Sequence, residues 1–535
     1  MNLERIALGL IALWIPLQLW YAWPALFATP FDGPWRYDPS IFAYEGLLLR
    51  SGAMPYVDFW DHKGPLIYLI DAAGLMLSGG QLWGIWTVGL VAIWSACAAV
   101  YAALRATFGV PAALAGVVFL LLALAGIDTS ANMTEQYALP LACASALVLV
   151  RWTRSRASLI AGLALGVLGA LGFFLRANLA GAPASAALTV VVVLLGAGDM
   201  RGARHHASGL VIGALTVCLP LLAWLADGGA LQAFWQQAIV YNLQYSQATW
   251  SQRATTGIVG LWMASATAPL VLPLGGLIVA VRRLLRERLE SAQQTVLFFA
   301  VVWLGAELIL ASVSGRPYDH YFMMLLPPLA TLTGVLVTAG LPTLLPSLWR
   351  RVPYPAVSAA LLVLVLLRPL IDRFVERARA PGLLPDAATS QVMLTADFVR
   401  ANSAPDDRLL VWGLAGGVYF LSDRPPASRY LFAFPLLTPG YGDSVAPRFL
   451  ADLRRSAPHL IVDATVSDPS APSLDAWNGA WRFPQSRWYA PFRTMTPALQ
   501  PFYAFVAENY SVIGVVGPER WTVYRANTGT VGTVR

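Results

Sequence analysis

The chain has 535 residues, of which 57% are hydrophobic and only 12% are charged. Soluble domains carry about 25% charged residues, so the composition excludes an ordinary soluble protein and predicts a polytopic membrane protein. The formal net charge of +7 comes from arginines set mainly in short loops between apolar runs, which argues against a nucleic-acid partner. All three cysteines lie inside apolar runs, so neither an external disulfide framework nor a metal site is predicted.

Apolar runs long enough to cross a hydrocarbon layer of roughly 30 Å recur along the chain. They predict an α-helical polytopic membrane protein with about eleven transmembrane helices, the first of them an uncleaved helix and not a signal peptide. The expected spans are 6–28, 82–104, 110–127, 136–152, 157–175, 183–198, 207–226, 256–281, 293–313, 320–341 and 353–370.

The arginine clusters set the expected orientation. Arg105 and the clusters within 151–156, 201–204, 282–288 and 350–351 all lie on one side of the membrane when the N-terminus is cytoplasmic. An odd number of spans then places the terminal segment outside. We therefore expect a multi-pass protein of the bacterial cytoplasmic (inner) membrane, with a cytoplasmic N-terminus and an external C-terminal domain.

The pattern divides the chain into two domains. Residues 1–370 are predicted to form the transmembrane domain, with external loops at 29–81 and about 227–255. Residues 371–535 alternate short apolar runs with helical periodicity and are predicted to form a soluble α/β domain. The expected strands are "RLLVWGL", "HLIVDA", "YSVIGVV" and "WTVYRA", and the expected helices include "QVMLTADFVRAN" and "PRFLADLRRSA".

The first external loop contains a predicted helix that begins with an acidic residue. Asp38-Pro39 opens a periodic run that ends at Arg50 and is followed by Gly52, as expected for a helix with a capped start and a glycine just past its end. We expect this helix to lie on the membrane surface. Asp38 is then either a helix cap or a carboxylate held near the bilayer boundary for chemistry.

Lys63, in "VDFWDHKGPL", is the one lysine in the chain, since the other 35 of the 36 basic residues are arginine. Arginine extends to lipid headgroups as well as lysine does, so an interfacial role does not explain the exception. A compact ammonium differs from a guanidinium where it meets a phosphate oxygen in a tight space. Lys63 is therefore a candidate phosphate ligand, and Tyr37 and Asp61 in the same loop are candidate substrate-binding residues.

Two more stretches lie on the same side of the predicted membrane. In "IDTSANMTEQYALP", Glu135 starts a helix, where it either binds substrate or only complements the helix dipole. In "SVSGRPYDHYFMMLLPP", Arg316 and His320 gather at a helix start and form a candidate anion site, and Tyr321 beside them is a candidate substrate-binding residue. A polar loop with interfacial tyrosines is the alternative for the second stretch.

Three other features have competing interpretations. Glu307 and Arg176 lie within or at the end of predicted spans, where ionisable residues are functional or pair with each other. The glycine-rich stretch 413–423 is more typical of a turn than of a phosphate-binding loop. Tyr241, Tyr245 and Trp250 either stack on a sugar or are interfacial aromatic residues.

Three stretches together carry a family resemblance: "YDPSIFAYEGLLLRSGAMPYVDFWDHKGPL", "NMTEQYALPLA" and "GRPYDHYFMMLLPP". On these the chain resembles membrane glycosyltransferases of the GT-C superfamily over about residues 1–345. It is most similar to the branch that contains protein O-mannosyltransferases, the lipid A aminoarabinose transferase and rhizobial galacturonosyltransferases. The resemblance implies the GT-C fold.

The resemblance also implies a reaction. A sugar would move from a polyprenyl-phosphate donor to an acceptor hydroxyl of an envelope glycan, lipid or protein outside the membrane, with Asp38 as base. Lys63 matches the family lysine at the donor phosphate, although Gly64 follows it where the family often has proline, and Arg316 and His320 are assigned to the phosphate by position. No cofactor beyond the lipid-linked donor is implied, and a divalent metal has no support in the sequence.

Two rival functions remain open at the level of sequence. A membrane transporter or flippase of lipid-linked or small polar substrates would also have many spans, intramembrane charges and external loops. A transferase-like scaffold without catalysis is the other. The gathering of charged residues on one side of the membrane, and the absence of an internal sequence repeat, favour the transferase.

Overall fold

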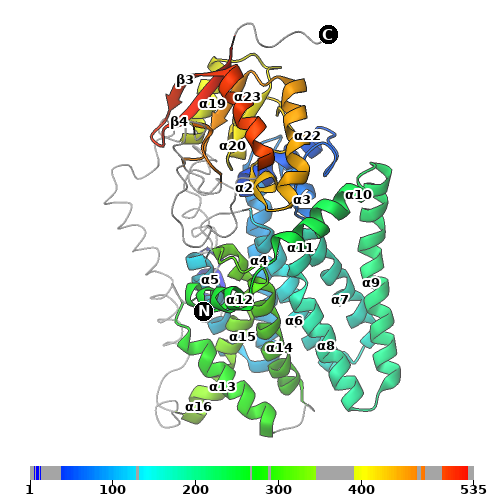
Figure 1. Cartoon of the computed structure of the whole chain (residues 1–535). Helices are drawn as coiled ribbons and strands as arrows, with labels where there is room; N and C mark the ends of the chain where they lie inside the picture. The colour runs from blue at the N-terminus through cyan, green and yellow to red at the C-terminus, as the bar shows by residue number, and fades with distance from the viewer. Residues whose placement is uncertain are drawn as a thin grey trace. The chain divides into compact units, whose positions relative to one another are not determined.

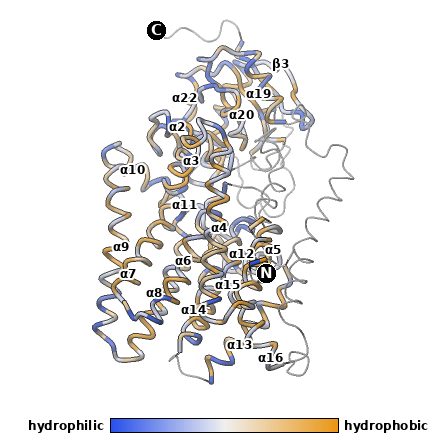
Figure 2. Tube along the Cα trace, turned by 180° about the vertical axis from the view of Figure 1, so that it is seen from behind, coloured by the Kyte–Doolittle hydropathy of each residue, from blue (hydrophilic) through white to orange (hydrophobic). Residues whose placement is uncertain are grey.

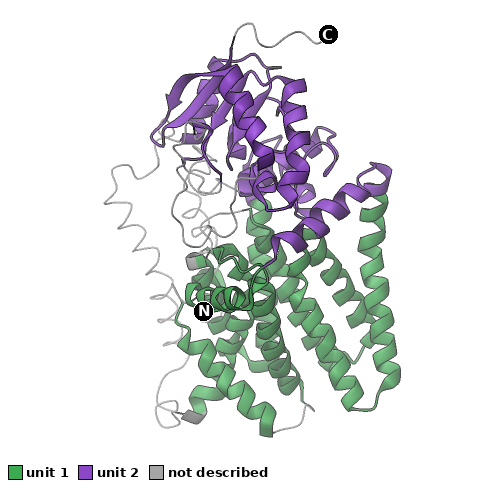
Figure 3. Ribbon diagram, in the orientation of Figure 1, with its two compact units in different colours: residues 1–22, 87–224, 248–381 green, residues 23–86, 225–247, 382–535 purple. Residues whose placement is uncertain are grey.

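The computed structural model describes residues 38–127, 132–264, 268–286, 291–344, 391–466, 471–475 and 497–527, with a few residues between 5 and 13. The chain divides into two compact units, each made of three separate segments (Figure 3). Unit 1 contains residues 1–22, 87–224 and 248–381, and unit 2 contains residues 23–86, 225–247 and 382–535. The first loop therefore groups with the terminal domain. The predicted boundary at residues 370 and 371 falls outside the described residues and stays a prediction.

Unit 1 consists of long apolar helices (Figure 1). Five helical runs among the described residues are long and apolar enough to cross a membrane, which makes this a multi-pass membrane protein. Figure 2 shows hydrophobic residues along most of α9. The main helices are α4 (Trp83–Phe108), α5 (Val110–Ile127), α6 (Thr134–Ser155), α7 (Ser158–Leu175), α8 (Gly181–Gly196), α9 (Met200–Asp227), α12 (Trp250–Met263), α13 (Val271–Arg286), α14 (Ala292–Ser312) and the run η3–α15–η4–α16 (Asp319–Leu344).

Most predicted spans correspond to these helices, with one exception. The prediction of a single span over 256–281 is wrong, because the chain forms α12 and α13 with a bend before Pro269. α12 ends at Met263 and α13 begins at Val271, two residues after Pro269, whereas the hydropathy of the run stays high throughout. Proline is tolerated just before or at the start of a helix but not in its interior. The predicted span 353–370 and most of 6–28 lie outside the described residues, so the total of eleven stays a prediction.

Helices α7 and α9 approach closely through small residues. A Cβ atom on Gly162 or Gly166 of α7 would lie 2.2 Å from the carbonyl oxygen of His206 or Leu210 of α9. The contact is reciprocal, since a Cβ on Gly213 of α9 would lie 2.1 Å from Leu163 O. In a lipid environment no hydrophobic effect drives two helices together, because the lipid tails are as apolar as the helix surfaces. Small residues let the helix backbones approach closely, so that packing contacts hold the helices together instead.

Unit 2 combines the first loop with a four-stranded sheet. The sheet order is β1-β2-β4-β3, with β1 and β2 parallel and the other pairs antiparallel. Every residue of β1 and β2 is buried, whereas β3 at the edge exposes part of its length. The strands are β1 (Leu409–Trp412), β2 (Leu460–Asp463), β3 (Tyr510–Val516) and β4 (Trp521–Ala526), and the helices around them are α19 (Gln391–Ala401), α20 (Gly416–Ser422), α21 (Phe434–Leu437), α22 (Tyr441–Ser456) and α23 (Gln500–Asn509).

The four predicted strands and both quoted helices of the terminal domain are confirmed. The glycine-rich stretch 413–423 differs from the expected turn, because it continues into α20 after Gly413. Gly413 has a φ of 121°, a backbone conformation that side chains with a Cβ rarely adopt. The glycine therefore allows the chain to turn as it leaves β1, three residues before α20 begins at Gly416.

The predicted helix of the first loop, α2 (Asp38–Arg50), has the expected ends. Gly52 has a φ of 95° and donates its N–H to Leu49 O, while Ala53 donates to Leu48 O, both at 3.0 Å, which together form a Schellman motif. The expectation that α2 lies on a membrane surface stays a prediction, and all residues from 39 to 46 are buried within the protein. They pack between α3 (Leu66–Leu77) and α20, which no local pattern in α2 can reveal.

We predict that Gly166→Ala destabilises the fold by about 1–3 kcal/mol, because the new methyl group meets backbone that cannot move aside cheaply. Gly305→Ala in α14 is the matched control, since a Cβ there has no atom within 4 Å and alanine favours a helix by about 1 kcal/mol. Thermal unfolding of both purified variants measures the difference. Equal melting temperatures for the two variants would contradict the close contact of α7 and α9.

Candidate functional site

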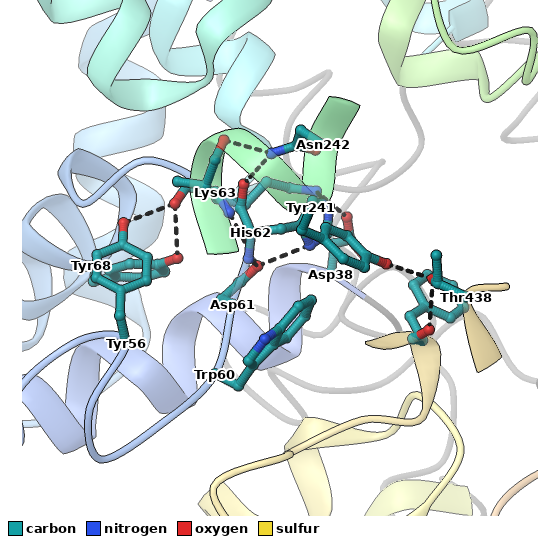
Figure 4. Close-up of polar contacts among 12 residues, drawn as sticks. Asp38, Tyr56, Trp60, Asp61, His62, Lys63, Tyr68, Tyr241, Asn242 and Thr438 are labelled. Carbon is teal, nitrogen blue, oxygen red and sulfur yellow. Dashed lines mark hydrogen bonds and ion pairs between the residues drawn. The ribbon is translucent and has the colours of Figure 1, made fainter. Parts of the chain in front are cut away.

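One face of α2 carries the polar residues of the site. Asp38, Phe42 and Glu45 are spaced by four and three residues, so they share a side of the helix. The Lys63 ammonium lies 3.3 Å from Asp38 Oδ2 and 5.7 Å from the centroid of the Phe42 ring. The turn that contains Lys63 therefore lies against this face of α2 (Figure 4).

Asp61, His62 and Lys63 form a tight turn, called here the DHK turn. Asp61 Oδ1 accepts the backbone N–H groups of His62 and of Lys63, the latter at 3.2 Å. The carbonyl of Lys63 accepts the hydroxyl groups of Tyr56 at 2.8 Å and Tyr68 at 3.3 Å. A side chain that bonds its own following backbone, with two tyrosines from outside, fixes the turn in one conformation.

A second segment of unit 2 also supports the turn. This segment holds α10 (Leu231–Phe234), η2 (Trp235–Val240) and α11 (Tyr241–Tyr245). Asn242 Nδ2 donates to the carbonyl of His62 at 2.7 Å, as Figure 4 shows. The DHK turn thus contacts α2 on one side and α11 on another.

An aromatic wall closes the site. The Trp60 ring packs edge-on against Tyr241, with centroids 4.9 Å apart, and its N–H donates to the Tyr441 hydroxyl at 2.8 Å. The Tyr241 hydroxyl shares a hydrogen bond of 2.8 Å with Thr438 (Figure 4). Tyr241 is fully buried by these contacts, whereas both sequence interpretations placed its ring at a surface.

The side chains of the DHK turn and of Asp38 form a continuous chain of close polar contacts, in the order Asp61, His62, Lys63 and Asp38. His62 Nδ1 lies 3.1 Å from Asp61 Oδ1, and His62 Nε2 lies 3.1 Å from Lys63 Nζ. Lys63 Nζ then reaches Asp38 Oδ2. Only 4% of the Lys63 side chain is exposed, against 22% of the Asp38 side chain, so Asp38 is the member of the chain that solvent reaches.

Burial and neighbouring charge set the protonation of the three buried groups. Burial raises the pKa of Glu45 well above its ordinary value, and the negative charge of Asp61 raises it further. Burial also pushes the pKa of Asp61 up, but the contact with His62 and the positive charge of Lys63 outweigh it and lower that pKa. Burial and the charge of Lys63 lower the pKa of His62 to about 4. At neutral pH we therefore expect an ionised Asp61 and a neutral His62, and the direction of the Glu45 pKa shift favours the protonated form of that residue.

Glu45 and His62 are not among the residues predicted for the site. Glu45 is fully buried, and among the described residues neither of its carboxyl oxygens makes a hydrogen bond. Its spacing of seven residues from Asp38 was a usable signal, because it places both acids on one face of the predicted helix. His62 gave no such signal, since only the three-dimensional turn brings its ring against Lys63.

The remaining candidates that the structure describes belong to unit 1. Glu135 Oε1 lies 2.6 Å from Arg176 Nη1, and the Arg176 guanidinium lies 4.0 Å from the centroid of the Tyr321 ring. His320 packs edge-on against Tyr321, with ring centroids 4.7 Å apart. Arg316, which precedes His320 in the same stretch of sequence, is buried. Glu135 is thus engaged by Arg176, and the substrate and phosphate roles expected for these residues stay predictions.

The remaining expectations concern the pairing of Arg176 with Glu307, the position of Tyr37 and metal binding. Arg176 pairs with Glu135, and the Glu307 carboxylate accepts the indole N–H of Trp303 at 3.0 Å, so the suggested pairing of Glu307 with Arg176 is wrong. Tyr37 lies outside the described residues. Among the residues that are described, no group of three or more histidine, cysteine or acidic side chains is placed to hold a metal ion.

The architecture matches solved membrane glycosyltransferases. ArnT from Cupriavidus metallidurans, bound to undecaprenyl phosphate, is 16% identical with a TM-score of 0.55, over 98% of this chain and 99% of that chain. The oligosaccharyltransferase from Archaeoglobus fulgidus in the apo form is 13% identical with a TM-score of 0.56, over 96% of this chain and 80% of that chain. The chain therefore has the fold of the GT-C glycosyltransferases.

The chain belongs to the family described as the putative competence-induced protein Ccs4 N-terminal domain, whose model matches residues 40–353. That range includes the DHK turn and ends before the terminal sheet. No curated protein sequence matches the chain. The narrower resemblance to one branch of the GT-C superfamily stays a prediction.

We predict that Glu45→Gln removes a pH dependence of stability. The folded chain holds the Glu45 proton more tightly than the unfolded chain, whose ordinary pKa is about 4.5, so this stabilisation is complete below that pH and is lost as pH rises toward the raised value. The unfolding free energy of wild type relative to the Gln variant should fall by up to about 1.4 kcal/mol per pH unit. Unfolding curves from about pH 5 to about pH 9 measure it.

Glu508→Gln is the control for Glu45→Gln, because it removes an exposed carboxyl group from α23 in the same unit. Its unfolding curves should follow those of wild type at each pH. Parallel curves for wild type and Glu45→Gln would show that Glu45 is not protonated in the folded protein.

We also predict that Arg176→Gln destabilises the fold by about 3–5 kcal/mol, because it takes the guanidinium away from the buried Glu135 carboxylate. The double variant Glu135→Gln/Arg176→Gln should lose less than the single variant. Arg455→Gln is the control, since its pair with Asp452 has the same N–O distance of 2.6 Å but its side chain is 77% exposed. Additive effects of the two unit 1 substitutions in unfolding experiments would rule out the expected coupling.

Proposed function

We propose that this protein is a membrane glycosyltransferase that moves a sugar from a polyprenyl-phosphate-linked donor to an acceptor hydroxyl on the outer side of the bacterial cytoplasmic membrane. Asp38 acts as the base and Lys63 holds the donor phosphate. The observation that carries the proposal is the contact of the Lys63 ammonium with Asp38, 3.3 Å apart, in a chain with the GT-C fold.

The proposed role of Asp38 follows from its exposure and its partner. The acceptor oxygen must lose a proton as it attacks the anomeric carbon of the sugar, and a carboxylate within hydrogen-bond reach can take that proton. Asp38 is the partly exposed acid of the chain of groups, whereas Glu45 and Asp61 are fully covered. An acceptor that arrives from solvent therefore meets Asp38 first.

The proposed role of Lys63 follows from the leaving group. As the bond from the anomeric carbon to the lipid phosphate breaks, negative charge grows on the phosphate, and a fixed cation in a water-poor site stabilises that charge. Lys63 is buried and held by a rigid turn, so little reorganisation is needed. The neighbour ArnT is described as bound to undecaprenyl phosphate, which supports a lipid phosphate as the ligand class here.

The donor and the acceptor are proposed as classes only. The donor is a sugar on a polyprenyl phosphate, and the acceptor is an envelope glycan, lipid or protein. The terminal domain lies outside the membrane in this proposal, together with the first loop that shares its unit.

We predict that Asp38→Asn lowers the transfer rate by about 10²- to 10⁴-fold, because the amide cannot accept the proton. The measurement compares lipid extracts of native cells that express wild type or the variant at equal levels. A polyprenyl-phosphate sugar should accumulate in the variant while one glycosylated envelope component is lost. Lys63→Ala should produce the same accumulation.

Asp58→Asn is the matched control, because Asp58 is an exposed acid of the same loop that accepts only the backbone N–H of Met54 among the described residues. Its lipid profile should equal that of wild type. If Asp38→Asn leaves both the lipids and the envelope unchanged at equal expression, the transferase assignment is wrong and transport of a polar substrate becomes the better account.

A further inference from the structure

We infer that His62 is a positioning residue for Lys63: its imidazole is the neutral acceptor that holds the ammonium at the donor-phosphate site. This inference rests on the proposed function and adds to it a residue outside the expected site. Three contacts carry it, those of His62 with Asp61, with Lys63 and with the aromatic wall.

The geometry fixes which nitrogen of His62 carries the proton. A lysine ammonium has three donors and no acceptor, so His62 Nε2, 3.1 Å from Lys63 Nζ, must be the acceptor. The proton of the neutral ring is then on Nδ1, which faces Asp61 Oδ1 at 3.1 Å. The same Asp61 oxygen accepts the two backbone N–H groups of the DHK turn. The carboxylate therefore fixes the backbone of the turn, and it lies close to Nδ1 of the ring without meeting the angular criteria of a hydrogen bond to it.

The surroundings of His62 keep the ring in place and neutral. The charged and titratable groups that face it are Asp61 and Lys63 in its own turn, Asp38 from α2, and Tyr241 and Tyr245 from α11. The rings of Tyr241 and Tyr245 lie 5.3 and 5.8 Å from the imidazole, centroid to centroid. A second positive charge beside the ammonium is disfavoured in so buried a place.

A neutral acceptor suits a lysine that must bind a phosphate. A second carboxylate at this distance would orient the ammonium equally well but would cancel its charge together with Asp38. The neutral imidazole fixes the direction of Nζ. It adds no second negative charge to the pair of Lys63 and Asp38. The phosphate then competes with one carboxylate and not with two, which preserves affinity for an anion.

Two substitutions distinguish the effect of losing the hydrogen-bond acceptor from the effect of losing the aromatic ring. His62→Phe keeps the aromatic packing against Tyr241 and Tyr245 and removes the acceptor. His62→Gln removes the ring and keeps an acceptor at the reach of Nε2. The full-length purified protein in nanodiscs is titrated with undecaprenyl phosphate as the probe, beside wild type and Lys63→Ala, and the melting temperature of every variant is recorded.

The expected result is that His62→Phe weakens binding of undecaprenyl phosphate by about 10- to 100-fold, the range for a lost hydrogen bond to a charged group. His62→Gln should bind within about threefold of wild type, even where its melting temperature falls further than that of His62→Phe. A purely structural role would give the opposite order, because loss of the ring disturbs the aromatic wall more than loss of a nitrogen atom does.

The outcomes separate this inference from the proposed function. If His62→Phe binds like wild type while Lys63→Ala loses binding, the role of His62 is wrong and the role of Lys63 stands. Equal weakening by Phe and Gln also overturns the inference, since the acceptor would then not matter. If Lys63→Ala binds like wild type, or wild type itself does not bind, the proposed donor site is wrong and the inference falls with it.

Discussion

The ammonium of Lys63 is the constraint around which unit 2 is organised. A buried charge costs several kcal/mol of desolvation unless close partners and good hydrogen bonds compensate it. The chain meets this cost with partners from different places: Asp38 from α2 and His62 from the adjacent residue. Asp61, Tyr56 and Tyr68 hold the turn itself, and Asn242 of α11 fixes it from a distance of 180 residues along the chain.

The parts of the fold that local periodicity determines were predictable from the sequence. The four strands of the terminal sheet and most long helices of unit 1 lie where the apolar patterns place them. The C-terminal end of α2 was predictable for the same reason, because Gly52 acts through backbone contacts within a few residues. The failure over 256–281 has the converse cause: hydropathy averages over a window and does not detect the break between α12, which ends at Met263, and α13, which begins at Val271.

Only some residues of the candidate site were predictable from the sequence. Lys63 was identified because lysine is an unusual residue type in this chain, and Asp38 because of the family resemblance and its place at a helix start. The structure brings their side chains together. Asp61 was identified only as a candidate for substrate binding. Glu45 and His62 were not identified, since their roles depend on contacts that the three-dimensional structure creates. Burial of α2 comes from α3 and α20, and the wall at Trp60 is completed by Tyr241 and Tyr441. No periodic pattern encodes such contacts.

The single lysine now has a physical explanation that combines geometry with charge. Its partners, His62 Nε2 and Asp38 Oδ2, are single atoms at 3.1 and 3.3 Å, with the Phe42 ring close beside them. An ammonium is a compact point charge that can satisfy separate acceptors in different directions. A guanidinium is planar, presents its donors as a rigid fork and favours two parallel acceptors on one group. The site offers acceptors arranged for the first cation, which is why arginine, used at every other basic position, does not replace Lys63.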